Sequence, residues 1–123
     1  MHKNHFVFPK AHRVRKSCDY KRILNNGTKI ICPYFILIGV PCLVSTKMGL
    51  IVSKKVGHAV YRNRVKRKLR EVFRQQTLST FWPDGVAYEF VLIARKKAVF
   101  VDYQELEKSF ELSLKLLKKR CLN

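Results

Sequence analysis

The residues with the clearest chemical potential lie between Ala59 and Arg74, in the sequence AVYRNRVKRKLREVFR. This segment places seven Lys and Arg residues in sixteen positions, with Glu71 as its one acidic residue. Like charges one helical turn apart, such as those of Lys66 and Arg70, repel each other by about 0.2–0.5 kcal/mol. Guanidinium groups, in turn, suit bidentate contact with phosphate. The segment therefore predicts a polyanionic partner, for which nucleic acid is the leading candidate and an anionic membrane the weaker one.

The same segment has the periodicity of a helix with two different faces over residues 59–78. The apolar face, which would pack on the rest of the fold, consists of Tyr61, Val65, Leu69, Val72 and Phe73. The other side carries Asn63, Arg64, Arg67, Lys68, Arg70, Glu71 and Arg74, with Arg62 and Lys66 at the margins. A merely solvated face would intersperse Glu and Lys at i,i+4, whereas Arg67 and Glu71 form the one such pair here. The pattern predicts contact with nucleic acid but does not distinguish RNA from DNA.

The composition of the whole chain agrees with a basic nucleic-acid-binding domain. The 123 residues include 26 Lys and Arg against 8 Asp and Glu, giving a formal net charge of +18 and a pI near 10.2. This length predicts one domain over residues 1–123, and 47% hydrophobic residues allow a packed core without metal or disulfide. The apolar run at 30–44 is shorter than the ~18 residues of a membrane span and contains Pro33 and Pro41. A buried strand is the expected reading of that run, and the first 22 residues hold no apolar stretch of signal-peptide length.

Residue types that catalyse hydrolysis or bind metals are not grouped in the sequence. Glu71 is a lone carboxylate among cations, and His2, His5, His12 and His58 have no partner at a useful spacing. The four cysteines form no CxxC pair, so they predict reduced thiols that pack as small hydrophobes. We therefore expect no catalytic residue, no metal site and no cofactor bound by this chain.

Two further helices are indicated at the ends of the chain. SCDYKRILNNG (17–27) predicts a short helix, with Ser17 as its N-cap and Gly27 in the left-handed position after its end. The last helix has a capping box, in which Asp102 is the N-cap and Glu105 follows three residues later. Its apolar stripe is formed by Leu106, Phe110, Leu114 and Leu117.

Strands are expected between these helices. YFILIGV (34–40), MGLIVSK (48–54) and AYEFVLIAR (87–95) have strand-like composition, and the third follows the turn signal WPDG at 82–85. The order of helix, strands, helix, strand and helix predicts an α+β fold in which one sheet packs with helices.

The segment GLIVSKKVGHAVYRNRVKRKLREVFR (49–74) resembles the signature of the bacterial ribonuclease P protein family. In that signature a strand leads into Ser-Lys-Lys-x-Gly, and Ala-Val-x-Arg-Asn-Arg-x-Lys-Arg-x-x-Arg-Glu follows. The matching residues are Ser53, Lys54, Lys55, Gly57, Ala59, Val60, Arg62, Asn63, Arg64, Lys66, Arg67, Arg70 and Glu71. The resemblance extends over most of the chain, including SCDYKRILNNG, FVLIAR and YQELEKSF.

The resemblance implies both a fold and a function. The fold would be a two-layer α/β sandwich, with a sheet of about four strands packed with helices and a left-handed βαβ crossover (ribosomal protein S5 domain 2-like). Family members bind a large catalytic RNA, and the complex removes the 5′ leader from precursor tRNA. The RNA holds the active site and its Mg²⁺, while the protein helps bind the leader and lowers the metal requirement. The expected partners are the catalytic RNA subunit and precursor tRNA, without DNA or membrane, in the cytoplasm.

The resemblance also implies a surface that faces the catalytic RNA. Asn63 could instead serve to position the helix, but the family match favours contact with RNA. A flexible basic arm, residues 1–16, is expected to contact phosphates as well. The expected RNA-binding residues are Lys54, Lys55, Arg62, Asn63, Arg64, Lys66, Arg67, Arg70 and Arg74 with Arg13, Arg15 and Lys16 from the arm.

A second implied surface is a cleft between the first helix and the sheet, where the family holds single-stranded leader. The matching positions are Tyr20 and Leu24 on the helix and Tyr34, Ile36 and Ile38 on the strand. Leu24 and Ile38 stand where the family often has aromatic residues, so we expect weaker base stacking there, with Tyr20 carrying more of it. The alternative is that these apolar residues belong to the core. His58 also departs from the family, replacing the Asn that usually precedes Ala-Val, and is the poorer N-cap.

Two other classes of function remain open at this point. The charge and size fit a ribosomal or other structural RNA-binding protein equally well. An autonomous nuclease is disfavoured because the catalytic clusters that it needs are missing from the sequence.

Overall fold

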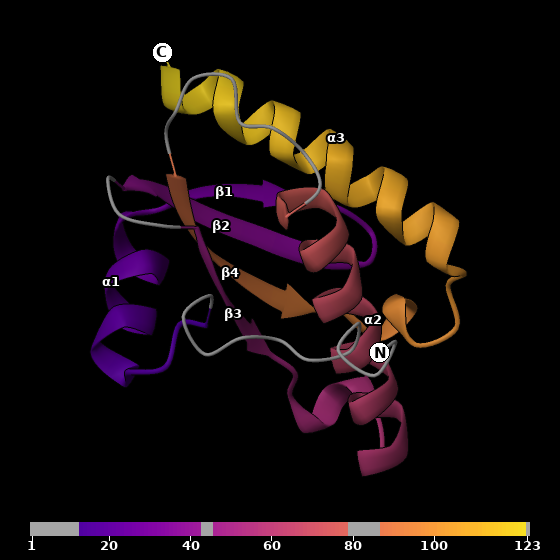
Figure 1. Ribbon diagram of the computed structural model, residues 1–123. Coiled ribbons are helices and arrows are strands. Elements are labelled where there is room, and N and C mark those ends of the chain that lie inside the picture. Colours follow the sequence, from indigo (N-terminus) through magenta and orange to yellow (C-terminus); the bar gives the residue numbers. More distant parts are fainter. Residues whose placement is uncertain (1–12, 43–45, 79–86, 123) are drawn as a thin grey trace, which may run out of the picture.

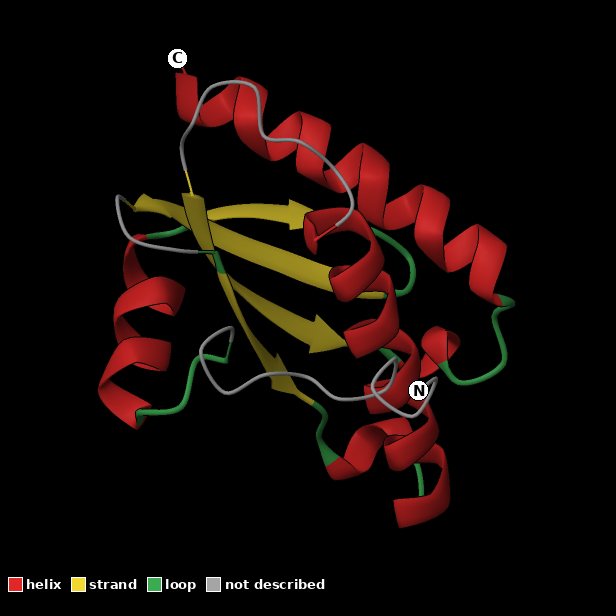
Figure 2. Cartoon of the chain, in the orientation of Figure 1, coloured by secondary structure: helices red, strands yellow, loops and turns green. Residues whose placement is uncertain are grey.

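The computed structural model describes residues 13–42, 46–78 and 87–122, in which three α-helices and four strands form one α+β unit (Figures 1 and 2). In chain order the elements are α1 (Ser17–Asn26), β1 (Thr28–Ile31), β2 (Phe35–Cys42), β3 (Lys47–Ile51), the 3-10 turn η3 (Lys54–Val56), α2 (Ala59–Leu78), β4 (Ala87–Ala94), the 3-10 turn η4 (Lys96–Ala98) and α3 (Tyr103–Leu122). The basic helix spans the predicted residues 59–78.

The four strands form one mixed sheet in the order β1-β2-β4-β3. β4 lies in the middle, antiparallel to β2 and parallel to β3. Because β3 and β4 are parallel neighbours, the chain must cross over between their ends, and α2 is that crossover. The basic helix therefore connects two strands that pair with each other, and this pairing fixes both of its ends relative to the sheet.

The main core lies between one face of the sheet and the helices α2 and α3 (Figure 1). The predicted apolar face of α2 is buried here, with Val65, Leu69, Val72 and Phe73 fully inaccessible. Phe73 meets Phe90 of β4 edge to face, with ring centroids 6.2 Å apart. The expected α+β sandwich, with a sheet of about four strands, is confirmed.

Within the described residues, α1 packs on the other face of the sheet and covers part of it. Ile23 of α1 is buried against Ile38 and Val91. Gly27 follows α1 with a φ of −79°, so it does not take the expected left-handed conformation. A glycine is required there for space, because a Cβ would lie 2.6 Å from both the Ile23 carbonyl oxygen and Ile38 Cγ2. Ser17 was also expected as the N-cap of α1, but it is the first helical residue.

α3 begins as its sequence predicts. The Glu105 N–H donates to Asp102 Oδ1 at 2.8 Å, which confirms Asp102 as the N-cap. The stripe of Leu106, Phe110, Leu114 and Leu117 is buried. α3 approaches β2 so closely that a Cβ on Gly39 would lie 2.7 Å from Leu117 Cδ2.

The strands differ from their predicted bounds, most clearly at β1 and β3. β1 was not predicted as an individual strand, and it is only four residues long. The strand expected at 48–54 ends at Ile51, because the chain turns into η3 three residues later, at Lys54. The turn signal at 82–85 lies outside the described residues.

Candidate nucleic-acid interface

One side of α2 presents a group of polar and cationic side chains, which we call the α2 ridge. It consists of Asn63, Arg64, Lys66, Arg67 and Arg70, all exposed except the half-buried Lys66. Packing fixes this side outward, because the fully buried residues of α2 hold the opposite side against the sheet. The ridge contains most of the α2 residues that the sequence predicted to contact RNA, and they lie on one helix face.

The chain enters α2 through a turn that places two more cations before the ridge. Lys54 and Lys55 are exposed in η3, and Ser53 Oγ accepts the Lys55 N–H at 3.3 Å. Gly57 then adopts a φ of +147°, a conformation that L side chains rarely adopt. The spacing of Ser53, two lysines and Gly57 thus has a local structural cause, and the resulting turn places Lys54 and Lys55 just before α2.

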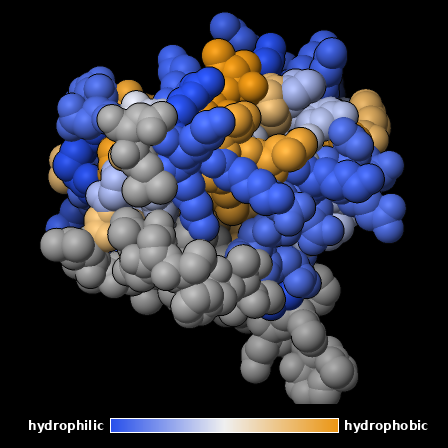
Figure 3. All heavy atoms as spheres, turned by 90° about the horizontal axis from the view of Figure 1, so that it is seen from above, coloured by the Kyte–Doolittle hydropathy of each residue, from blue (hydrophilic) through white to orange (hydrophobic). Residues whose placement is uncertain are grey.

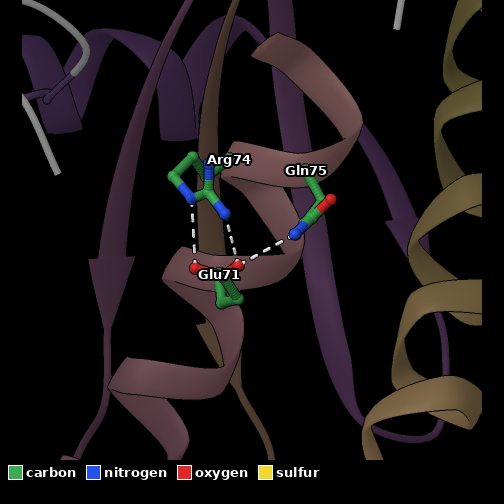
Figure 4. A network of polar contacts seen from close by, with 3 residues as sticks. All are labelled: Glu71, Arg74 and Gln75. Carbon is green, nitrogen blue, oxygen red and sulfur yellow. Dashed lines mark hydrogen bonds and ion pairs between the residues drawn. The ribbon is translucent and has the colours of Figure 1, made fainter. Parts of the chain in front are cut away.

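Three residues of α2, Glu71, Arg74 and Arg62, have surroundings that the sequence did not indicate. Glu71 does not pair with Arg67 as its i,i+4 spacing suggested; it accepts two hydrogen bonds from Arg74, at 2.6 and 3.1 Å, and one from Gln75 (Figure 4). Arg74, which was expected to bind RNA, is half-buried and held in this ion pair. Arg62 is also half-buried, and its Nε has no hydrogen-bond partner among the described residues. Arg62 and Arg74 are therefore less accessible to phosphate than Arg64, Arg67 and Arg70 of the α2 ridge.

Lys68 has a structural role that the sequence did not indicate. Its Nζ donates to the carbonyl oxygens of Val99 and Val101, at 3.0 and 2.8 Å. Burial lowers the pKa of this amine, the neighbouring Arg64 lowers it further, and Asp102 raises it. Lys68 thus ties α2 to the loop before α3, a contact between residues too distant in sequence for any local pattern to reveal.

Tyr103 is half-buried, and its hydroxyl has no hydrogen-bond partner among the described residues. Burial, followed by the charges of Glu107 and Glu71, raises its pKa from 10.0 to about 12. The folded pKa exceeds the unfolded one, so the stability linked to the neutral phenol is complete below pH 10 and is lost as the pH rises toward 12.

We expect Tyr103→Phe to be at least as stable as the unchanged chain at pH 8, because no hydrogen bond is lost. Between pH 10 and 12 the unchanged chain should lose about 1 kcal/mol more unfolding free energy than the variant, since Tyr103 is only half-buried and solvent screens most of the effect. Urea unfolding over this pH range measures the difference. An equal loss of unfolding free energy in both proteins over this pH range would show that Tyr103 does not titrate as described.

The described part of the predicted basic arm lies against the edge of the sheet. The Val14 N–H donates to the Met48 carbonyl at 3.0 Å, and the Val14 side chain is buried. Residues 13–16 are thus tied to the fold, whereas residues 1–12 of the arm lie outside the described residues. Arg13, Arg15 and Lys16 remain exposed.

A small pocket of about 200 Å³ lies between this arm, α1 and α2. Arg13, Tyr20, Lys66 and Arg70 contribute to its lining, together with the Gly49 segment of β3. A Cβ on Gly49 would lie 2.6 Å from the Tyr20 ring, so the glycine lets this ring lie directly on the strand. The pocket brings the α2 ridge next to Tyr20, the first of the residues expected to hold the leader.

The face of the sheet beside α1 presents partly exposed apolar side chains, which we call the α1 face: Tyr20, Leu24, Ile36, Ile51 and Ile93. The three isoleucines form one row across the sheet, because Ile93 is the register partner of both Ile36 and Ile51. Ile51 and Ile93 were not predicted from the sequence as part of this face. The alternation of apolar residues in the strands was the available signal, but which face they occupy depends on where α1 packs.

Two residues expected in the leader cleft do not belong to this face. Ile38 is only 2% exposed and packs in the core beneath α1, so the alternative reading of this residue as core is the correct one. Tyr34 packs with the main core on the opposite face of the sheet. It precedes the first residue of β2, so the alternation of the strand does not extend to it.

The described residues hold no group of three or more His, Cys, Asp or Glu that could bind a metal ion. None of the four cysteines, all of which lie within the described ranges, forms a disulfide. Neither of the 20-residue helices, nor any other helix within the described ranges, has the apolar length that a membrane span needs.

Hydrophilic residues cover much of the side where α3 lies, with apolar areas between them (Figure 3). Leu112 and Leu116 are exposed apolar side chains of that helix.

Comparison with known proteins gives a consistent result. The family model for ribonuclease P matches residues 8–118. The ribonuclease P protein component of Petrotoga mobilis is 35% identical over 92% of this chain and 94% of its own length. That of Geotalea uraniireducens is 37% identical over 93% of this chain and 97% of its own.

Solved structures agree with the sequence relatives. A Staphylococcus aureus RNase P protein mutant, described as having defective mRNA degradation activity, is 31% identical with a TM-score of 0.77, covering 89% of this chain and 90% of its own. The RNase P protein of Thermotoga maritima is 28% identical with a TM-score of 0.69, covering 87% of this chain and 96% of its own. The match of the family model over most of the sequence, supported by these relatives, shows that the chain belongs to the ribonuclease P protein family.

Proposed function

We propose that this chain binds the catalytic RNA of ribonuclease P through the α2 ridge and the 5′ leader of precursor tRNA through the α1 face. The assembled complex then removes the leader to give the mature 5′ end of tRNA, in the cytoplasm. The observation that carries the proposal is the α2 ridge itself, in which exposed arginines gather on one helix face. Relief of their mutual repulsion by phosphates favours binding to a folded RNA.

The two surfaces suit two different kinds of RNA contact. The α2 ridge offers guanidinium groups at helical spacing, which match the phosphates of an RNA backbone. The α1 face offers an aromatic ring and a row of isoleucines, which suit the unstacked bases of a single strand. The pocket that Arg13, Tyr20, Lys66 and Arg70 help to line lies where the two surfaces meet. One chain can thus contact the catalytic RNA and the leader at once.

In this proposal the chemical step belongs to the RNA subunit and the Mg²⁺ that it holds. The described residues of the chain offer no carboxylate or histidine cluster that fits a resident metal ion. The protein would contribute by holding the leader and neutralising phosphates, which lowers the Mg²⁺ concentration that the complex needs.

Reconstituted cleavage of precursor tRNA at low Mg²⁺ tests the proposal. We expect the protein alone to be inactive, the catalytic RNA alone to be slow, and the mixture to release the leader rapidly. Substantial release of the leader by the protein alone would contradict the proposal and favour an autonomous nuclease. A mixture no faster than the RNA alone would contradict the protein's supporting role.

A further inference from the structure

Phe100 lies on the surface in the loop between η4 and α3. Its side chain is 77% exposed, the highest value among the large exposed apolar side chains of the described residues. Its neighbours Ala98 and Val99 are buried, so the loop is packed against the fold on one side while Phe100 extends into solvent. Hydrophobic burial therefore does not explain the aromatic residue at this position.

Phe100 belongs to a group of rings at the start of α2, which we call the aromatic cluster: His58, Tyr61 and Phe100. The Tyr61 and Phe100 rings meet edge to face, with centroids 5.7 Å apart and planes at 67°. The His58 ring lies 6.5 Å from Tyr61 on a tilted plane. The Tyr61 ring also packs closely on the backbone of Gly57, where an added Cβ would lie 3.3 Å from the ring. Several aromatic rings are thus gathered at the surface.

The contacts of Lys68 hold Phe100 in this cluster. Its two hydrogen bonds go to the carbonyl groups of Val99 and Val101, the residues on either side of Phe100. A lysine that could have joined the cationic surface of α2 is instead partly withdrawn from solvent, at the expense of a lowered pKa. The backbone on both sides of Phe100 is thereby fixed relative to α2, which reduces the entropy lost when a ligand binds the ring.

The surroundings of the aromatic cluster are cationic. The Arg64 guanidinium lies 5.7 Å from the Tyr61 ring centroid, within cation–π range. An open pocket of about 370 Å³ beside it is lined by Val60, Asn63, Arg64, Arg67 and Lys68. Rings with guanidinium and amide groups next to them suit the stacking of an unpaired nucleobase whose phosphate binds the arginines. An apolar protein partner is disfavoured, because it would have to desolvate these charges.

We propose that the aromatic cluster stacks an unpaired base of the catalytic RNA, adjacent to the phosphates bound by the α2 ridge. This inference rests on the proposed function, since it takes the catalytic RNA to be the partner of α2. It adds a base-stacking site away from the α1 face, which lies across the sheet. Phe100 was not predicted from the sequence as a site residue.

The test compares variants of the full chain in titrations with the catalytic RNA. Phe100→Ala should weaken binding at least fivefold, because stacking of one base contributes about 1–3 kcal/mol. The slope of log K against log salt should stay unchanged, because no charge is removed. Phe100→Leu keeps apolar bulk without a ring and should lose a similar factor, whereas Phe100→Trp should bind as well as the unchanged chain. Leu112→Ala, which truncates an exposed apolar residue on α3, is the matched control and should bind normally.

The possible outcomes separate the stacking site from the proposed function. If the unchanged chain binds the catalytic RNA but Phe100→Ala binds within twofold of it, the stacking site alone is refuted. Normal binding by Phe100→Leu would also refute stacking. If the unchanged chain does not bind the RNA, the proposed function fails and the stacking site fails with it. In the assembled complex, Phe100→Ala should change the affinities for precursor and mature tRNA by the same factor. A loss of affinity confined to the precursor would show that Phe100 contacts the leader, and would overturn the assignment to the catalytic RNA.

Discussion

Replacing Arg64, Arg67 and Arg70 together with alanine is expected to weaken binding of the catalytic RNA by about 100- to 1000-fold at 0.1 M salt. Each phosphate contact releases about 0.7–0.9 of a counterion, which corresponds to nearly tenfold in affinity at this salt concentration. The three side chains are exposed on the α2 ridge, so their removal should leave the fold intact. The slope of log K against log salt should also become less steep, by about 2–3. Titrations at several salt concentrations measure both quantities.

A charge-matched control separates specific contact from the general field of a strongly basic protein. Lys108, Lys115 and Lys119 are exposed on α3, and their joint replacement by alanine removes the same formal charge. If the α2 ridge makes the contacts, this control should retain most of the affinity and most of the salt slope. Equal losses in the two triple variants would mean that net charge, and not the ridge, attracts the RNA.

Tyr20→Ala is expected to lower the affinity of the assembled complex for leader-bearing precursor tRNA by about 10- to 100-fold, with little change for mature tRNA. The ring lies directly on Gly49 and forms one wall of the α1 face, and stacking of a base on it would contribute about 1–3 kcal/mol. Leu24 offers no ring to compensate for the loss. Binding of both tRNA forms to complexes assembled with either protein measures the selectivity.

Tyr20→Phe is the control for this experiment, because it keeps the ring and removes only the hydroxyl. It should retain selectivity for the precursor. An equal loss for precursor and mature tRNA in Tyr20→Ala would contradict the leader role and indicate that Tyr20 supports the fold or the catalytic RNA instead.

The sequence predicted best those features that depend on local periodicity. The buried and exposed sides of α2 follow from a 3.6-residue repeat, and its buried side is the predicted one, with Tyr61 only partly covered. The start of α3 follows from the side chain of Asp102, which caps the helix within three residues of itself. In both cases the interactions that decide the structure lie within a turn or two of the chain.

Features that depend on packing between distant segments were missed or wrongly placed. Ile38 has the right strand phase for the α1 face, but α1 packs directly on it and removes it from the surface. Tyr34 precedes the regular strand, so its orientation is set by the main core. Lys68 was placed among the polar residues of α2, whereas it bonds to carbonyls more than 30 residues along the chain.

The sequence pattern likewise did not predict which arginines of α2 pair with Glu71 and which stay exposed. Glu71 has cationic neighbours at both i−4 and i+3, and spacing alone favoured Arg67. In the structure Arg74 makes a two-point contact with the carboxylate, which leaves Arg67 on the exposed ridge. Fewer arginines are therefore available to RNA than the sequence count suggests, and those that remain are concentrated on one face.

Two neighbouring surfaces of this chain, the α2 ridge and the α1 face, are proposed to bind two different RNAs, and one paired titration tests this most directly. The triple arginine variant and Tyr20→Ala are each measured for affinity toward the catalytic RNA and for selectivity between precursor and mature tRNA. We expect the arginine variant to lose affinity for the catalytic RNA but, once saturated with it, to keep its selectivity for precursor tRNA. Tyr20→Ala should keep its affinity for the catalytic RNA and lose that selectivity. If both variants lose the same property to a similar extent, the two faces do not have separate RNA partners, and the account is wrong.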